Sequence, residues 1–585
     1  MSVLTIDVGT SVIKSVVFDD QGQELAVSRI GTEVLRPRPG WAEQDMDAVW
    51  NGVVFTVRSA LSRLGPGRDP VWLVSFTAQG DGCWLVDGDG RPTGPAVLWS
   101  DGRAGDLLTR WQADGVLEQA FRRNGSLTCS GMPNAVLSWL AAHDPERLRR
   151  SRSALTAAGW LFLKFTGVTA VDESDASAPF LDHATGAYDP VILDLFSMRW
   201  AEPLLPRILG EHERIAEITH HTAAELGLPA GLPVVMAPYD IAATARGAGA
   251  VSPGQACAIL GTTLCTEIVT REPDTGGEPC GINIAYRGRE RILRAFPTLS
   301  GTEVLDWACR TLSVPDPAQL GRLAFGTGPG AGGLAFLPYL SPAGERAPFL
   351  DPRARGSFWG LSLDHTPAHV ARAVFEGLSL VVRDCLAASG TDVHELRLCG
   401  GGSASDAWCR LIADVTGVPT ARGADTELGA KGAFLTGLVL TGAESSMHSA
   451  AAKYVRMRAN WEPDAERAAF YDGLYDSYLT WRAAARSLGW APAPAAGPAP
   501  APTAGPAPAP TAGPAPAPTA GPAQAPAPAA GPAPAPTAGP AQAPAPAAGP
   551  APAPAPAARA PAARPGAAPA VPAESPAGTT EAPHV

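Results

Sequence analysis

Polar and apolar positions near the start of the chain predict two β-strands joined by a tight turn. Residues 4–8 and residues 15–20 are rich in apolar and β-branched side chains, which is typical of strands. The turn between them carries Gly9, Thr10 and Ser11. Gly9 allows a close backbone approach to a ligand, and hydroxyl and amide N–H groups suit phosphate oxygens. A polar hairpin tip without a ligand has the same residues, so this turn alone does not decide its function.

Strand-like and helix-like patterns alternate along the chain up to about residue 488. Apolar runs predict strands at residues 71–76, 95–99, 233–237, 256–260 and 396–399. Helical periodicity predicts helices at residues 132–142, 366–388 and 406–416, and the second of these opens on a threonine cap followed by proline. This alternation is typical of α/β proteins whose sheets are covered by helices.

A second glycine–hydroxyl turn, Gly261-Thr262-Thr263, follows the strand predicted at residues 256–260. It repeats the arrangement of Gly9-Thr10-Ser11, so we expect two similar α/β domains, residues 1–243 and 244–488. Small-molecule sites tend to lie in clefts between domains. The two turns are therefore expected to bind one polyphosphate from opposite sides.

Composition separates a C-terminal segment from the rest of the chain. From Ala491 onward nearly every residue is Ala, Pro, Gly or Thr, with the unit Thr-Ala-Gly-Pro-Ala-Pro-Ala-Pro recurring imperfectly. Proline at this density blocks helices and sheet ladders, and large side chains that could offset the ordering entropy are missing. Residues 489–585 are therefore expected to form a disordered tail.

The bulk properties predict a soluble cytoplasmic protein. The net charge is −12 and lies almost wholly before the tail, which argues against a nucleic-acid surface. Nine cysteines are scattered with no C-x-x-C spacing, as expected in a reducing compartment. The sequence shows no signal-peptide pattern and no apolar run long enough to cross a bilayer, so no membrane partner is expected.

Three further segments carry residues suited to chemistry. Asp240 ends an apolar strand and precedes small residues, which suits a general base, although a helix N-cap aspartate fits equally well. The glycines 400–402 join a predicted strand to a predicted helix, where a flat group can pass the backbone; a flexible connection is the alternative. Trp84 and Trp99 lie beside polar residues and are either core residues or surfaces on which a carbon skeleton stacks.

Several short motifs follow one another along the chain before the tail. They are Thr5-Ile6-Asp7-Val8-Gly9-Thr10-Ser11, Gly40-Trp41-Ala42-Glu43-Gln44-Asp45, Trp99-Ser100-Asp101-Gly102-Arg103, Asp240-Ile241-Ala242-Ala243, Gly261-Thr262-Thr263, Gly344-Glu345-Arg346-Ala347-Pro348, the stretch from Gly356 through Gly360 to Glu376, and Gly400-Gly401-Gly402. With these motifs, the chain from about Val3 to Gly489 resembles the FGGY family of carbohydrate kinases, within the sugar kinase/Hsp70/actin superfamily.

The resemblance implies two RNase H-like domains, as in actin-like ATPases, that close over ATP and a sugar. Asp240 would take the proton from a terminal hydroxyl, which attacks the γ-phosphate in line, and Asp7 would hold Mg²⁺. The implied ATP contacts are Gly9, Thr10, Ser11, Lys14, Gly261, Thr262, Thr263, Gly400, Gly401 and Gly402. The partners implied are a small sugar or polyol and ATP, and a homodimer is common among such kinases.

The segment after residue 78 bears on the choice of acceptor. It reads Gln79-Gly80-Asp81-Gly82-Cys83-Trp84, where xylulokinases usually have Gln-Met-His-Gly and glycerol kinases an Arg-Glu pair. Asp81 would accept hydrogen bonds from two hydroxyls, and Gly80 would leave room for a substrate longer than glycerol. The segment looks like that of the erythritol kinase branch, which favours a short polyol or ketose. The acceptor contacts so implied are Gln79, Gly80, Asp81, Trp84, Trp99, Asp101, Arg103 and Asp240.

Alternatives stay open on three points. Ile241 follows Asp240 where most members of the family carry Asn or Gln, which removes one polar contact to the sugar. Xylulose, glycerol or gluconate is the alternative acceptor, and a catalytically silent sugar-sensing protein is the non-enzymatic alternative. A proline-rich tail also suits a scaffold that docks into an SH3-like groove, but this tail lacks the basic residues that such ligands usually carry.

Overall fold

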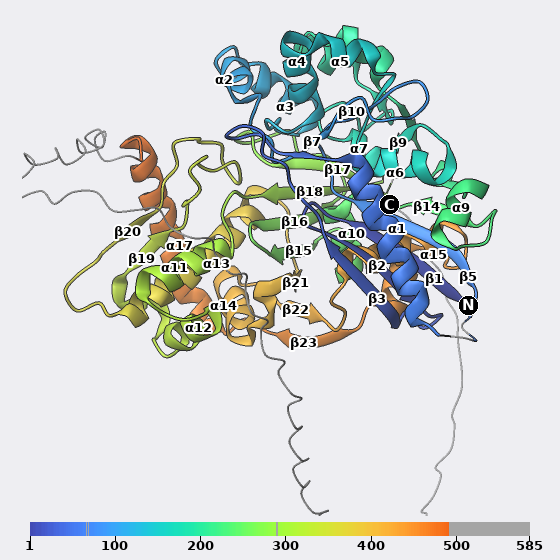
Figure 1. The fold of residues 1–585 in the computed structure, drawn as a ribbon. Coiled ribbons are helices and arrows are strands. Elements are labelled where there is room, and N and C mark those ends of the chain that lie inside the picture. Colours follow the sequence, from blue (N-terminus) through green and yellow to red (C-terminus); the bar gives the residue numbers. More distant parts are fainter. Residues whose placement is uncertain (66, 68, 288–289, 491–585) are drawn as a thin grey trace, which may run out of the picture. The chain divides into compact units, whose positions relative to one another are not determined.

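The computed structural model describes residues 1–65, 67, 69–287 and 290–490 (Figure 1). The expected disordered tail lies outside the described residues from Ala491 onward. Within the described ranges, no helix is both long and apolar enough to cross a membrane.

The first main sheet is built from the N-terminal hairpin and later strands. Its order is β13 (Ile215–Glu217), β14 (Pro233–Met236), β5 (Val71–Ala78), β1 (Ser2–Val8), β2 (Val12–Phe18) and β3 (Glu24–Gly31). β1 and β2 run antiparallel with Asp7 opposite Lys14, which confirms the predicted hairpin. β5 is parallel to β1, and β14 is parallel to β5, so the carboxyl ends of three strands meet at one edge.

The second main sheet repeats this arrangement. Its order is β17 (Ile282–Arg287), β18 (Arg291–Pro297), β16 (Leu264–Thr270), β15 (Gln255–Leu260), β21 (Glu395–Cys399), β22 (Thr420–Gly423) and β23 (Met457–Trp461). β15 and β16 form an antiparallel hairpin, and β21 and β22 continue in parallel from β15. The repeated topology confirms the prediction of an α/β fold with two similar halves.

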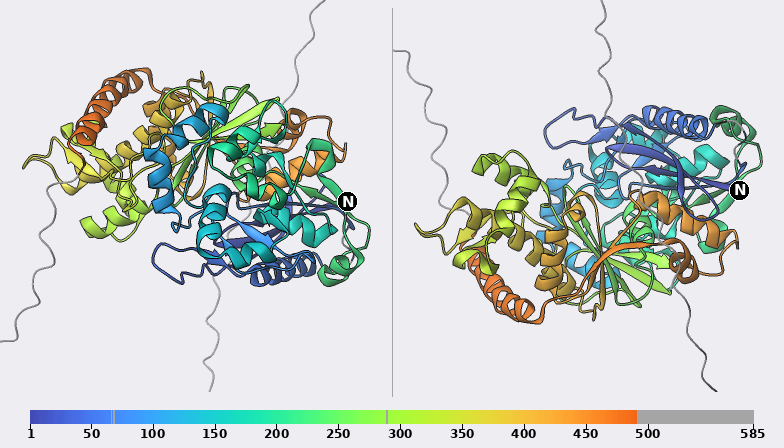
Figure 2. Two further views of the ribbon diagram at one scale, coloured as in Figure 1. Left: turned by 90° about the horizontal axis from the view of Figure 1, so that it is seen from above. Right: turned by 90° about the horizontal axis from the view of Figure 1, so that it is seen from below.

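Helices cover the sheets (Figures 1 and 2). In chain order they are α1 (Met46–Arg63), α2 (Gly105–Ala113), α3 (Val116–Asn124), α4 (Pro133–His143), α5 (Pro145–Arg150), α6 (Ala157–Thr166), α7 (Glu173–Ala176), α8 (Pro190–Leu195), α9 (His220–Leu226), α10 (Asp240–Ala248), α11 (Glu303–Leu312), α12 (Pro317–Phe325), α13 (Pro367–Ala388), α14 (Asp406–Thr416), α15 (Leu428–Leu440), α16 (Met447–Tyr454) and α17 (Ala465–Ser487).

Short strands complete the fold. They are β4 (Glu43–Gln44), β6 (Trp84–Val86), β7 (Ala96–Val97), β8 (Ser153–Leu155), β9 (Ala170–Asp172), β10 (Leu181–Asp182), β11 (Ala187–Tyr188), β12 (Arg207–Leu209), β19 (Ala335–Leu337) and β20 (Ser357–Trp359). The strand predicted at residues 95–99 is reduced to β7, which pairs with the equally short β4, forms an isolated bridge from Val97 to Cys83, and lies outside both main sheets.

The predicted helices form for the reasons that the sequence indicates. α4 and α14 match the predicted ranges to within one residue. α13 begins after Thr366, whose side chain forms a reciprocal capping box with His369, and Pro367 occupies the first turn. The middle of α13 is buried on all sides in the core of the second half, where it packs against β16 and β19.

α10 and α15 cross with almost no space between their backbones. A Cβ atom on Gly432 would lie 1.8 Å from the carbonyl oxygen of Ala243, and one on Gly247 would lie 2.0 Å from that of Leu428. α15 then packs on the first sheet, where Phe434 contacts the core around Phe18 (Figures 1 and 2). A segment from the expected second domain therefore covers the first sheet.

Candidate active site

One edge of the first sheet gathers the candidate residues. Asp7 is the penultimate residue of β1, Gln79 follows β5, and Asp240 lies four residues beyond the end of β14. Because β1, β5 and β14 are parallel neighbours, their carboxyl ends meet, and this is where open α/β sheets bind ligands. The second sheet brings Gly261 and Gly400 to the corresponding ends of β15 and β21.

A cavity of about 180 Å³ joins residues from both halves. Its polar lining consists of Thr10, Asp81, Tyr239, Asp240, Thr263 and Arg346. Its apolar lining includes Leu127, Cys129, Met132, Ile241, Cys265 and Ile282. Both hairpin turns, the segment after β5 and the candidate base thus reach one small space. Small-molecule sites usually measure roughly 300–1,000 Å³, so this cavity suits a small ligand.

Asp240 opens α10 instead of capping it. The N-cap position belongs to Tyr239, and the Asp240 carboxylate accepts a hydrogen bond of 2.8 Å from the Ile241 backbone N–H. Burial, followed by the nearby charge of Asp7, raises the pKa of Asp240 to about 7. A carboxylate with this pKa is suited to accept a proton near neutral pH, which favours the base over the N-cap interpretation.

Asp81 and Arg346 place opposite charges on the cavity wall. Asp81 has a left-handed backbone (φ 53°), and burial raises its pKa to about 6 against the opposing charge of Arg346. Arg346 donates from Nε to the carbonyl oxygen of Pro297 at 2.8 Å, and its guanidinium lies 5.6 Å from the centre of the Trp99 ring. The sequence motif contains Arg346, but nothing in its local pattern indicated that it lines this cavity.

A closed hydrogen-bond network fixes the Thr10 side chain. The Trp99 Nε1–H donates to Thr10 Oγ1 at 2.8 Å, and Thr10 Oγ1 donates to Gln79 Oε1 at 2.7 Å. Gln79 then donates to Gln44, and Gln44 donates to the Thr10 carbonyl oxygen, each at 2.8 Å. An indole N–H can only donate, so it sets the direction of the whole network. Gln79 thus supports the cavity from behind the turn.

The space beside Gly80 is filled by protein. A Cβ atom on Gly80 would lie 2.4 Å from Cδ2 of Tyr239 and 2.6 Å from Cε2. The expectation that Gly80 leaves room for a longer substrate is therefore wrong, because the tyrosine ring takes that room. Tyr239 precedes the candidate base, and the local sequence gave no sign that it meets Gly80 across the fold.

Three other predicted acceptor contacts lie away from the cavity. Trp84 is fully buried in the core and packs on Trp160 with ring centres 5.4 Å apart. Arg103 donates to Asp101 at 2.8 Å and to Glu43 at 2.6 Å, under the Trp41 ring. These side chains do not line the cavity; the Arg103–Asp101 pair instead holds the strand that carries Gln44. The physical reason is that Trp84 packs on Trp160, while Arg103 and Asp101 bind each other, so all three side chains are already paired within the first half.

Asp7 lies in surroundings that suit a cation. Its carboxylate is 8% exposed and lies 3.6 Å from Lys14 Nζ, which also contacts Glu427 at 3.1 Å. Burial raises the pKa of the Asp7 carboxyl above its usual range, so one lysine shared with Glu427 does not fully stabilise its charge. Among the described residues no cluster of three or more His, Cys, Asp or Glu side chains could hold a metal ion. Mg²⁺ in phosphoryl-transfer sites commonly uses one carboxylate, waters and phosphate oxygens.

The three consecutive glycines serve different purposes. Gly400 has a positive φ of 79°, and a Cβ there would lie 2.8 Å from the Leu260 carbonyl oxygen. A Cβ on Gly402 would lie 2.5 Å from the Trp408 ring, whereas nothing lies within 4 Å of one on Gly401. Gly401 and Gly402 border a second cavity of about 520 Å³ whose walls include Leu305, Pro317, Phe375 and Trp408.

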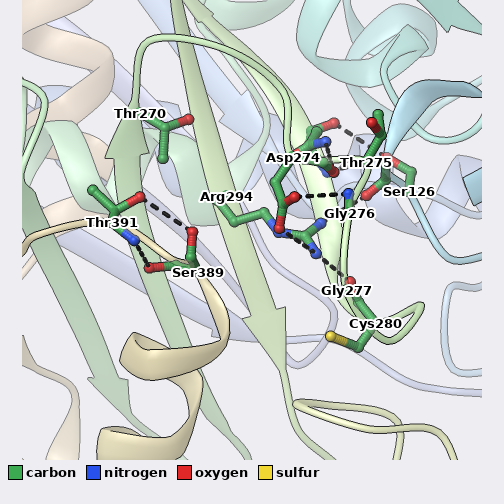
Figure 3. Close-up of polar contacts among 12 residues, drawn as sticks. Ser126, Thr270, Asp274, Thr275, Gly276, Gly277, Cys280, Arg294, Ser389 and Thr391 are labelled. Carbon is green, nitrogen blue, oxygen red and sulfur yellow. Dashed lines mark hydrogen bonds and ion pairs between the residues drawn. The ribbon is translucent and has the colours of Figure 1, made fainter. Parts of the chain in front are cut away.

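One wall of the cavity that Asp240 lines is formed where segments of the two halves are hydrogen-bonded to each other. The Leu127 N–H donates to the carbonyl oxygen of Gly281 at 2.9 Å. Arg294, 1% exposed, donates to the carbonyl oxygens of Gly125 and Cys280 at 2.7 and 2.6 Å. Figure 3 shows Arg294 reaching toward the Asp274 loop, with Ser126 beside it. These hydrogen bonds hold Leu127 and Gly281 against the cavity.

Comparison with known proteins agrees with this geometry. The N-terminal domain model of the FGGY family of carbohydrate kinases matches residues 2–247, and the C-terminal domain model matches residues 256–441. An erythritol kinase of Brucella abortus is 32% identical over 494 residues, which are 81% of this chain and 95% of that protein. An L-xylulose/3-keto-L-gulonate kinase of Escherichia coli is 33% identical, over 75% of this chain and 88% of that protein.

Solved structures share the fold. A xylulose kinase from Rhodospirillum rubrum superposes with a TM-score of 0.77 and 26% identity, over 84% of this chain and 100% of that one. A ligand-bound xylulose kinase from Lactobacillus acidophilus gives a TM-score of 0.78 at 22% identity, over 83% and 98% of the two chains. The family models and these relatives thus define a two-domain phosphotransferase with an alcohol group as acceptor. The chain belongs to the FGGY family of carbohydrate kinases.

Proposed function

We propose that this kinase transfers the γ-phosphate of ATP to a terminal hydroxyl of a short polyol or ketose, with an erythritol-like acceptor favoured. The observation that carries the proposal is the shared cavity, where Asp240 and Asp81 face one small space flanked by Thr10 and Thr263. Its volume of about 180 Å³ and its largely apolar lining favour an acceptor with few carbons and few hydroxyls.

Asp240 acts as the general base in this proposal. Its carboxylate takes the proton of the terminal hydroxyl while that oxygen attacks the γ-phosphorus and the bond to the β-phosphate oxygen breaks, releasing ADP. The carboxylate is buried at the cavity wall, and its pKa of about 7 makes it basic enough to accept a proton without remaining protonated above neutrality. Asp81 accepts hydrogen bonds from other hydroxyls of the acceptor.

The ATP contacts are assigned to the second turn, to Asp7 through its metal ion, and to Gly401. Thr262 and Thr263 have hydroxyls without a hydrogen-bond partner in the described part of the chain, so both are available to phosphate oxygens. Asp7, with a raised pKa and a single shared lysine, is the ligand for Mg²⁺, which neutralises charge on the β- and γ-phosphates when bound. The apolar cavity beside Gly401 suits an adenine ring.

A second acceptor class has one observation in its favour. Arg346 brings a guanidinium to the cavity, and among the described residues it forms no ion pair within 4.0 Å. A carboxylate on a keto-sugar acid would pair with it. The Escherichia coli relative is named for L-xylulose and 3-keto-L-gulonate, which makes this class the alternative to test.

The test is a panel of acceptors in an assay of ADP release. The panel holds erythritol, L-erythrulose, glycerol, D-xylulose, L-xylulose and gluconate at matched concentrations. We expect the highest kcat/KM with a four-carbon acceptor. Absence of turnover with every four-carbon acceptor, together with turnover of a pentulose or a sugar acid, would contradict the erythritol-like assignment and leave the kinase class intact.

A further inference from the structure

Tyr239 is a buried polar residue of the acceptor cavity that the proposed mechanism does not use. It occupies the N-cap position of α10, directly before Asp240, and only 4% of its surface is exposed. Its hydroxyl has no hydrogen-bond partner among the described residues. Buried tyrosine hydroxyls usually have one, because burial of an unpaired hydroxyl is unfavourable.

The charged residues that act on this hydroxyl are residues of the cavity. Burial, then the charges of Asp81 and Asp240, raises the pKa of Tyr239 well above its usual value. The hydroxyl therefore stays protonated, and the two carboxylates whose charges act on it line the same cavity as Tyr239. Its one donor and two acceptor positions are unused among the described residues.

The backbone is adapted to the tyrosine ring. Any side chain at position 80 would meet the ring, since a Cβ there would lie within 2.4–2.8 Å of three ring atoms. Contacts under 3.0 Å require one group to move. A side chain at position 80 and a tyrosine at position 239 thus exclude one another, and the ring closes the side of the cavity that a longer side chain at position 80 would otherwise occupy.

We propose that Tyr239 determines acceptor specificity: its hydroxyl hydrogen-bonds a substrate hydroxyl other than the one that Asp240 deprotonates, and its ring, seated on Gly80, limits the length of the acceptor. This inference rests on the proposed function, because it concerns the same cavity and the same acceptor class. Short polyols and ketoses carry a second hydroxyl within reach of such a donor, and longer sugars meet the ring.

The first experiment compares the wild type with Tyr239→Phe, which removes one oxygen and keeps the ring. With the panel member that gives the highest wild-type kcat/KM, we expect KM for the acceptor to rise about tenfold, while KM for ATP stays unchanged. The thermal midpoint of the free variant should not fall, since the hydroxyl has no partner to lose. The matched control is Tyr188→Phe, which loses a bond of 2.7 Å to the Pro206 carbonyl oxygen outside the cavity and should lower stability without changing KM.

The second experiment tests the contact between ring and glycine. Gly80→Ala should reduce kcat/KM for the acceptor at least about tenfold, because the new methyl group displaces the ring. The double variant Gly80→Ala/Tyr239→Ala should accept longer acceptors and should not show the added loss caused by alanine at position 80. Additive losses in the double variant would contradict the coupling.

The outcomes distinguish failure of the proposed function from failure of the role assigned to Tyr239. If the wild type phosphorylates no polyol or ketose of the panel, the proposed function and this inference both fail. If the wild type is active and Tyr239→Phe has the same acceptor KM, only the role of the hydroxyl fails. A fall in stability together with a change in KM for ATP would assign Tyr239 a structural role instead.

Discussion

The two glycine–hydroxyl turns occupy equivalent positions in the two sheets but are held differently. In the first turn, Thr10 is bound to Trp99 and Gln79, so its hydroxyl is already committed within the protein. In the second turn, Thr262 is exposed, and its hydroxyl, like that of Thr263, has no partner in the described ranges. The difference teaches that equal sequence signatures need not have equal roles. Both turns reach the cavity, but of their threonine hydroxyls only those of the second turn lack a partner among the described residues, and the proposed function assigns phosphate binding to them.

The largest effect is expected at Asp240, which lines the cavity together with Thr10 and Thr263 of the two turns. Asp240→Asn keeps the shape of the side chain and removes the base, so kcat should fall by about 10²–10⁴-fold with little change in ATP affinity. Turnover assays and ATP titration measure the two quantities. Asp106→Asn, an exposed change in the first turn of α2, is the control and should have no effect. Retention of wild-type kcat by Asp240→Asn would remove Asp240 from the mechanism.

The turns themselves can be compared by one isosteric change in each. Thr10→Val leaves the Trp99 N–H and Gln79 Oε1 without partners and should reduce the free energy of unfolding by about 1–3 kcal/mol. Thr262→Val removes no protein contact and should change stability by less than about 0.5 kcal/mol, while KM for ATP rises about tenfold. Denaturant unfolding and ATP kinetics give both numbers. Equal stability losses in the two variants would contradict the difference between the turns.

The pH dependence of activity tests the raised pKa of Asp240. Burial raises the pKa of Asp240 to about 7, so below that pH the carboxyl is mostly protonated and cannot accept a proton. We expect kcat/KM for the acceptor to rise about tenfold per pH unit up to pH 7 and then to level off. Below about pH 6 the protonation of Asp81 should steepen the fall. A flat profile from pH 6 to 8 would be incompatible with Asp240 as the titrating base.

The smallest effect is expected in glycines 400–402, which follow β21 beside Leu260 at the end of β15. Gly401→Ala meets no atom within 4 Å and should fold normally, with a few-fold rise in KM for ATP if the nucleotide passes this position. Gly402→Ala meets the Trp408 ring at 2.5 Å and should be destabilised instead. Thermal unfolding and ATP kinetics of both variants separate a binding glycine from a packing glycine. The reverse assignment of effects would show that Gly401 is the packing residue.

Local patterns predicted the elements well and the tertiary neighbours poorly. The hairpin around Gly9, the strand before Gly261 and the helix after Thr366 follow from periodicity and capping, which depend on neighbouring residues in the chain. Arg346 and Tyr239 line the same cavity although they are far apart in sequence. Local sequence patterns do not predict such tertiary contacts.

The same limit explains the residues that the structure places elsewhere. A tryptophan beside polar residues satisfies both a core and a ligand interpretation, and only the packing of Trp84 on Trp160 decides between them. The glycine at position 80 indicated that a side chain would not fit there. The sequence could not show that the Tyr239 ring occupies that space. Likewise the apolar face of α15 did not reveal that it covers the first sheet.

The most direct test of the account is phosphorus NMR of a reaction with ATP, Mg²⁺ and erythritol. The account predicts a phosphomonoester on a terminal hydroxyl of the four-carbon acceptor, formed in equal amount to ADP and at a rate about 10²–10⁴-fold lower when Asp240→Asn replaces the wild type. Formation of ADP with inorganic phosphate alone, or undiminished phosphomonoester with Asp240→Asn, would contradict it.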